Sequence, residues 1–247
     1  MALFAWIAIG FITGSILGLT GAGGAVIAIP LMIYYAHLSV TQASSVSLIV
    51  VGIGAALSWA QTKGTTRWAI IFPILIPAVL SASFFGLLKS RVPSSIVEAA
   101  LLLLIGYAVW ATWAPIRFFK QKYRSLPPLI GFGLGVGGVT ALTGLGGGLI
   151  LNPIYKSILG MEENDAKKSS LMSITITTTI AVLAQLRTVQ HMGITVYQLA
   201  VMIIGLFTSI GLVKTLSTLC SISCHQVLKK IVFTIVLFIA FITLLLK

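Results

Sequence analysis

The chain has 247 residues, of which 58% are hydrophobic and only 8% are charged, and its mean hydropathy is +1.09. This hydrophobicity is higher than that of an ordinary soluble core. It predicts an integral membrane protein with roughly eight to ten segments of the ~20-residue length that crosses hydrocarbon. It excludes a soluble catalytic domain of ordinary size. We interpret the net charge of +12 as loop charge that orients the chain and contacts anionic lipid, and not as a face that binds nucleic acid.

Apolar stretches follow one another along the chain and predict an all-α fold. In the first half they cover residues 2–19, 24–36, 41–60, 69–88 and 94–114. In the second half they cover residues 127–143, 146–159, 166–186, 194–213 and 226–246. A basic linker that ends at Pro127-Pro128 separates the halves. We therefore divide the chain into a first transmembrane repeat, 1–114, a linker, 115–126, and a second transmembrane repeat, 127–247.

One glycine motif occurs in both halves. Leu19-Thr20-Gly21-Ala22-Gly23-Gly24, followed by Pro30, returns as Leu142-Thr143-Gly144-Leu145-Gly146-Gly147, followed by Pro153. A shift of 123 residues superposes Gly10 on Gly133, Gly14 on Gly137 and Ser47 on Ser170. This self-similarity predicts an internal structural repeat.

The stretches 24–36 and 146–159 are too short to cross a ~30 Å hydrocarbon core as lone straight helices. With the stretch before it, each is predicted to form a glycine-broken re-entrant hairpin or one broken crossing, enclosed by protein because lipid cannot satisfy irregular backbone. Each half then adds three transmembrane helices.

The basic residues predict the relative orientation of the halves. In an antiparallel arrangement, twelve of the 16 basic residues fall on the side of the linker, and the other four are Lys89, Arg91, Arg187 and Lys247. In a parallel arrangement the two sides receive eight each. The positive-inside rule favours an inverted repeat, with a cytoplasmic linker and both termini outside.

The two glycine tips are the predicted substrate site. The arms that begin near Gly24 and Gly147 present helix N-termini, whose unpaired amides attract anions. No Asp or Glu falls in mid-membrane, so we expect no carboxylate proton relay and no sodium cage. The candidate substrate-binding residues are Thr20, Gly21, Gly23, Gly24, Thr143, Gly144, Gly146, Gly147, Asn152, Ser47 and Ser170. We expect a small oxyanion there, with no catalytic residue, metal or cofactor.

These motifs resemble the TauE/SafE sulfite exporter family over nearly the whole chain. The resemblance rests on Gly21-Ala22-Gly23-Gly24 leading to Ile29-Pro30-Leu31, on Gly144-Leu145-Gly146-Gly147-Gly148 leading to Asn152-Pro153, and on the segments 43–48 and 166–171. It implies a multi-pass, inner-membrane carrier of sulfite, thiosulfate or organosulfonates. A more usual family form is Ala-x-Gly-Thr-Ser-Leu, where this chain has Ala43-Ser44-Ser45-Val46-Ser47-Leu48.

Several of these residues also have a purely structural interpretation. The glycines could let helices pack closely, and Thr20 and Thr143 could cap helices or bond the local backbone. The serines and threonines of 41–60 and 166–186 could form interhelical hydrogen bonds. Gln61 and Gln185, near the ends of their segments, are expected at the membrane interface.

The sequence favours a secondary transporter that exports a small anion by alternating access between the repeats. Alternatives are a passive anion channel with the tips as its constriction and an uptake carrier for a related anion. An intramembrane enzyme or scaffold is disfavoured because paired carboxylates, a Ser-His pair and His-Glu metal spacing are missing from the membrane segments. A cation carrier is disfavoured by the lack of intramembrane carboxylates. The expected partners are the anion and the lipid bilayer, and the sequence leaves open whether the protein forms a homo-oligomer.

Overall fold

The computed structural model describes residues 2–20, 24–113, 126–186 and 196–219, and these are helical apart from short connections. The first half contains α1 (Ala2–Thr20), α2 (Gly24–Ala36), α3 (Val40–Gln61), α4 (Trp68–Leu88), the 3-10 turn η1 (Lys89–Arg91) and α5 (Ser94–Trp113). The second half contains α6 (Leu126–Thr143), α7 (Gly148–Pro153), the π-helical turn η2 (Ile154–Ile158), α8 (Glu163–Ala184) and α10 (Val196–Leu219). The predicted segment 226–246 and the linker up to residue 125 lie outside the described residues.

The observed helices begin and end close to the predicted stretches. The helix after the second glycine motif is the shortest, because its last turn widens into the π-helical turn η2. Of the described helices, Val40–Gln61 and the stretch Trp68–Arg91 are long and apolar enough to cross a membrane by length and composition, and five further apolar helices are shorter.

A capping box starts α3. The Ser39 hydroxyl accepts a hydrogen bond from the Gln42 N–H at 3.3 Å, and the Gln42 side chain accepts one from the Ser39 N–H at 3.0 Å. This reciprocal pair satisfies two amides that a helix N-terminus leaves without intrahelical acceptors. It fixes where the central helix begins.

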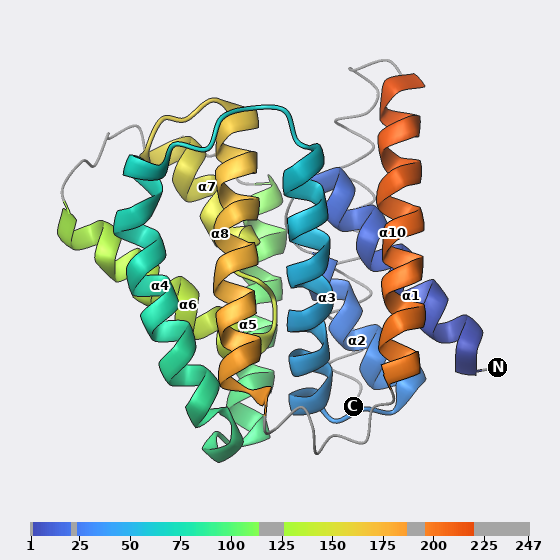
Figure 1. Ribbon diagram of the computed structural model, residues 1–247. Coiled ribbons are helices and arrows are strands. Elements are labelled where there is room, and N and C mark those ends of the chain that lie inside the picture. Colours follow the sequence, from blue (N-terminus) through green and yellow to red (C-terminus); the bar gives the residue numbers. More distant parts are fainter. Residues whose placement is uncertain (1, 21–23, 114–125, 187–195, 220–247) are drawn as a thin grey trace.

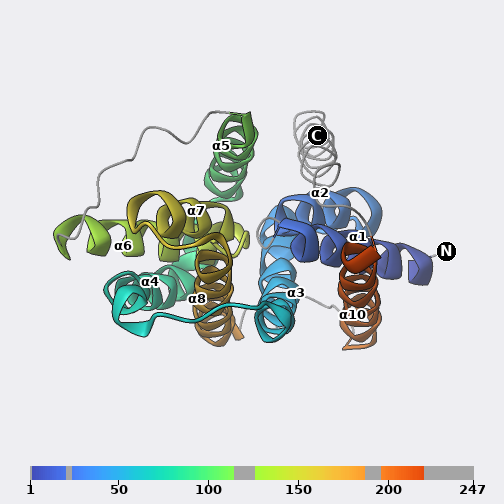
Figure 2. The same ribbon diagram turned by 90° about the horizontal axis from the view of Figure 1, so that it is seen from above.

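The helices form two lobes (Figures 1 and 2). One lobe contains α1, α2, α3 and α10, and the other contains α4, α5, α6, α7 and α8. Helix α1 packs along α10, and α4 packs along α6, so each lobe combines helices from both halves of the sequence. Helix α3 packs on α8 where the lobes meet. The repeats that the sequence defines are therefore not the lobes that the chain forms.

Glycines related by the 123-residue shift make corresponding helix contacts in the two lobes. A Cβ on Gly10 would collide with the Met202 carbonyl of α10, and a Cβ on Gly133 would collide with the Ile74 carbonyl of α4. Gly14 and Gly137, one turn further along α1 and α6, likewise face the backbone of α10 and α4. Close helix packing is thus the role of these four glycines.

The connection 62–67 reaches the N-terminus of α8 at the top of Figure 1. The Thr65 N–H donates to Asp165 Oδ1 at 2.8 Å, and its hydroxyl donates to Oδ2 at 3.0 Å. Arg67 Nε lies 3.4 Å from the same Oδ2. These bonds hold the start of α8 to the chain that joins α3 to α4.

Acid should weaken this junction. The backbone and hydroxyl hydrogen bonds from Thr65, with a smaller effect of Arg67, lower the pKa of Asp165 from its ordinary 3.8. A carboxyl with a depressed folded pKa stabilises the fold above its unfolded pKa, and this contribution is lost as the pH falls through the folded pKa. We expect the Tm of the detergent-purified protein to fall as the pH drops below about 4, and Asp165→Asn to remove that part of the decline.

The matched control is Glu163→Gln. Glu163 lies on the same first turn of α8 as Asp165, and its exposed carboxylate pairs with Lys156 of η2. Its pH profile should follow the unsubstituted protein more closely. If Asp165→Asn instead keeps the full acid-induced decline in Tm, the junction does not depend on the Asp165 charge.

Candidate functional site

The second glycine motif forms the turn between α6 and α7. Gly144, Gly146 and Gly147 have φ values of 76°, 73° and 65°, a region that side chains with a Cβ rarely adopt. The whole turn is buried. In a membrane protein, irregular backbone is tolerated where protein surrounds it. These three glycines therefore make a turn, which the helix-packing glycines of α1 and α6 do not.

Residues from α3, α6 and α8 enclose this turn. Ser47 Oγ on α3 donates to the Gly144 carbonyl at 3.0 Å, and a Cβ on Gly144 would collide with the Ser44 carbonyl. A Cβ on Gly146 would lie 2.6 Å from Val51 Cγ1 on α3 and 3.3 Å from Ile174 Cγ2 on α8. The turn therefore sits where the two lobes meet.

The turn ends at the N-terminus of α7. Gly147 is the N-cap, and its carbonyl accepts hydrogen bonds from the N–H groups of Ile150 and Leu151 at 3.1 and 2.9 Å. Helix α7 continues into η2, so the helical chain runs from 148 to 158. The first amides of a helix have no intrahelical acceptor and carry partial positive charge. This end of the helix is suited to an anion.

Four buried hydroxyls on the surrounding helices have no hydrogen-bond partner in the described part of the chain. They belong to Ser58 near the end of α3, to Thr140 on α6 and to Ser169 and Ser170 on α8, and all four residues are buried. Thr140 Oγ1 lies 2.7 Å from where a Cβ on Gly147 would be, next to the N-cap. A buried, unpaired hydroxyl costs about 1–3 kcal/mol, so these groups are available to a ligand. Thr140 and Ser169 were not among the predicted site residues. The 123-residue shift pairs Thr140 with Leu17, and Ser169 was expected to form an interhelical hydrogen bond.

The structure brings together Thr143, Gly144, Gly146, Gly147 and Ser47 of the predicted set. The Thr143 hydroxyl donates to the Val139 carbonyl at 2.6 Å and accepts from the Leu145 N–H at 3.4 Å, so it bonds the local backbone.

The other predicted site residues have different surroundings. Gly24 is buried at the start of α2, and a Cβ there would lie 2.8 Å from the Thr13 carbonyl. Asn152 is partly exposed on α7, and Ser170 is fully buried. Gly21, Gly23 and the side chain of Thr20 lie outside the described residues.

The prediction that serines and threonines join helices is correct for some of them. Besides Ser47, the Ser45 hydroxyl bonds the Gln185 side chain at 3.0 Å, and Tyr155 and Ser173 share a hydrogen bond at 2.8 Å. The run of threonines on α8 differs, because their hydroxyls donate to backbone carbonyls of α8 itself. These threonines are Thr175, Thr177, Thr178 and Thr179.

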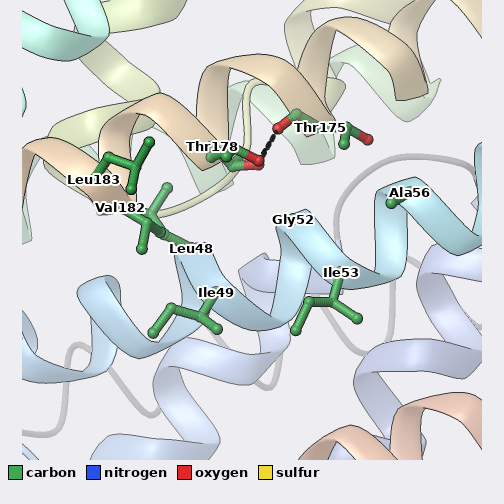
Figure 3. Close-up of a pocket in the computed structure, with 10 residues that line it drawn as sticks. Leu48, Ile49, Gly52, Ile53, Ala56, Thr175, Thr178, Val182 and Leu183 are labelled. Carbon is green, nitrogen blue, oxygen red and sulfur yellow. Dashed lines mark hydrogen bonds between the residues drawn. The ribbon is translucent and has the colours of Figure 1, made fainter. Parts of the chain in front are cut away.

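A cavity of about 260 Å³ opens between α3 and α8 (Figure 3). Leu48, Gly52 and Ala56 of α3 face Thr178 and Val182 of α8 across it. Its walls are largely apolar, because most of the lining side chains are aliphatic. The Thr178 hydroxyl is already bonded to backbone carbonyls of α8. Thr178 Cγ2 also lies 3.8 Å from where a Cβ on Gly146 would be. The cavity and the glycine turn are therefore separated by one side chain.

Two polar residues lie deeper than the sequence predicts. Gln185 is 1% exposed and Lys89 is fully buried, so protein encloses both side chains, and Lys89 is not an exposed loop charge. The Gln185 amide is satisfied by Ser45 and by the Ala141 carbonyl, at 3.0 Å each. A lysine at the end of an apolar stretch has the pattern of a side chain that reaches toward water, so the sequence contains no signal for its burial.

The family model described as sulfite exporter TauE/SafE matches residues 6–244. The chain belongs to this family. A search of curated proteins and a search of solved structures each found no match. Members of the TauE/SafE family are membrane transporters of sulfite or a related anion and not enzymes, which places this chain in a membrane and agrees with its all-helical, apolar fold.

Proposed function

We propose that this TauE/SafE protein is a secondary transporter that exports sulfite, thiosulfate or an organosulfonate. The observation that carries the proposal is the buried glycine turn 144–147 at the junction of the lobes. It offers the N-terminus of α7 and an unpaired Thr140 hydroxyl. The neighbours named above from α3, α6 and α8 include no acidic side chain. Such a site favours an anion over a cation.

Alternating access would arise from movement of the two lobes along the α3–α8 contact. The correspondence between the α1–α10 and α4–α6 pairs supports an inverted repeat, an architecture with its substrate site at the repeat interface. Because α4 and α10 each pack in a lobe with helices of the other half, the moving bodies would be lobes and not sequence halves. The turn 144–147 would then be exposed to each side in turn.

The proposed topology is that of a multi-pass inner-membrane protein with its linker in the cytoplasm and both termini outside. The contact between the 62–67 connection and the start of α8 supports this, because the antiparallel arrangement puts both on the linker's side. In a variant whose two cysteines, Cys220 and Cys224, are replaced by serine, a membrane-impermeant thiol reagent should label a cysteine introduced at Lys63 from the cytoplasmic side only. Labelling from the outside would show that the protein has the opposite orientation in the membrane.

Membrane potential can drive the export. Moving one negative charge out of a negative interior releases about 2.3 kcal/mol per 100 mV. A proton, if one is moved, could travel on the protonated anion, because the residues that surround the turn supply no carboxylate.

Reconstituted liposomes test the proposal. We expect vesicles that contain the protein and carry an inside-negative potential to lose internal sulfite, thiosulfate or methanesulfonate faster than protein-free vesicles. If none of the three anions leaves faster than from protein-free vesicles, the proposed substrate class is wrong.

A further inference from the structure

Lys89 places its amino group in the interior of the protein. It begins the η1 turn after α4 and has no exposed surface. Its Nζ donates to Ser45 Oγ at 2.9 Å. Both ion pairs found among the described residues, Arg67–Asp165 and Lys156–Glu163, lie elsewhere. Within the described chain, the ammonium therefore has a hydroxyl partner but no counter-ion.

The neighbours of Lys89 form one chain of hydrogen bonds across the lobe junction. The Ser45 hydroxyl donates to Gln185 Oε1, and Gln185 Nε2 donates to the Ala141 carbonyl, at 3.0 Å each. The Gln185 amide is thereby held with its oxygen toward Ser45, and the Ser45 oxygen is left to accept from Lys89. Ser45 belongs to one lobe, and Lys89, Gln185 and Ala141 belong to the other.

This chain of bonds lies beside the glycine turn. Ser45 follows Ser44, whose carbonyl faces Gly144, and Ala141 is in the last turn of α6, directly before the glycine motif. The buried charge and the helix N-terminus of α7 thus flank the same turn. Both favour negative charge, and they come from different parts of the sequence.

A buried ammonium needs more than one hydroxyl. It has three N–H donors, and burying a charge without an opposite charge is costly. A small oxyanion would supply both the missing charge and the missing acceptor oxygens. It could bind Lys89 while the Ser45 hydroxyl and the Gln185 amide rearrange around it.

We propose that Lys89, Ser45 and Gln185 form an anion-binding subsite beside the glycine turn, in which the Lys89 ammonium neutralises a small sulfur oxyanion. This inference rests on the proposed transport function. It adds a charged contact to a site that the sequence describes as helix ends and hydroxyls alone. Because the subsite spans the junction of the lobes, an anion bound there would contact both of them.

The test compares Lys89→Met with Lys89→Arg and with Lys63→Met, which removes an exposed lysine of the 62–67 connection. The Tm is measured without anion, and the half-saturating concentration for transport is measured with sulfite, thiosulfate and methanesulfonate. In Lys89→Met we expect an equal or higher Tm, because an unpaired buried charge is removed. We expect its half-saturating concentration to rise at least about tenfold, as for the loss of one charged hydrogen bond. Lys89→Arg should keep most of the affinity, and Lys63→Met should match the unsubstituted protein.

Two results would overturn the subsite and leave the proposed function standing. One is unchanged half-saturation in Lys89→Met, and the other is a large fall in its Tm without anion, which would show that the charge is paired within the fold. If the unsubstituted protein moves none of the three anions, the proposed function fails, and the subsite fails with it.

Discussion

Gly146→Val should abolish anion transport while the protein still inserts into the membrane. A side chain at a φ of 73° costs roughly 1–2 kcal/mol. The new Cβ would also lie 2.6 Å from Val51 Cγ1, and overpacking of this kind typically costs about 1–3 kcal/mol. The turn must therefore move, and the N-terminus of α7 moves with it. Misplacing a binding group by about 1 Å can lower a rate on the order of 100-fold, and anion efflux from liposomes measures that loss.

Gly135→Val is the matched control for this prediction. Gly135 lies on α6, and a Cβ there meets no atom within 4 Å, so the substitution adds the same side chain where space is open. We expect near-normal efflux from this variant. Normal efflux from Gly146→Val would instead show that the turn is not the substrate site.

Gly137→Val should separate α6 from α4 and unfold one lobe. A Cβ at Gly137 would collide with the carbonyl of Ala78, which is helix backbone and cannot give way as a flexible side chain can. We expect a loss of stability at or above the roughly 1–3 kcal/mol typical of overpacking. It should be visible as a lower Tm and an aggregated fraction on size-exclusion chromatography. Gly14→Val should act in the same way on α1 and α10, because a Cβ on Gly14 would lie 2.8 Å from the Leu206 carbonyl oxygen.

Gly131→Val controls for the added bulk, since Gly131 is exposed on α6 and a Cβ there meets no atom within 4 Å. If Gly137→Val is as stable as Gly131→Val, the close α4–α6 contact does not hold the lobe together.

The glycines show what the sequence could predict and what it could not. Their repetition predicted a repeated structure, but packing and turning both remained possible for each glycine. In the structure Gly10, Gly133 and Gly144 all lie against the backbone of a neighbouring helix, but only Gly144 and Gly146 also have positive φ and make a turn. Only the backbone conformation distinguishes these cases.

Helix positions were predicted well because apolar length sets them. Helix pairing was not predicted. Helix α1 packs on α10 and α4 packs on α6, each across the sequence halves. Helices with so few charged residues have little polar patterning from which the contacting faces could be predicted. The roles of the serines in the segment 43–48 were likewise not evident from the sequence. This segment departs from the more usual family form, and the structure gives its serines two uses: Ser47 holds the Gly144 carbonyl, and Ser45 accepts from Lys89.

Counterflow of labelled sulfite tests the central claim most directly. Liposomes that contain the protein are loaded with unlabelled sulfite and diluted into a trace of ³⁵S-sulfite. A carrier that alternates access should accumulate label transiently above the external concentration, and Gly146→Val should abolish this overshoot. Label that equilibrates without an overshoot would indicate a passive channel and would contradict the account. If labelled sulfite stays outside, the same measurement is made with thiosulfate and methanesulfonate, and no overshoot with any of the three anions would likewise contradict it.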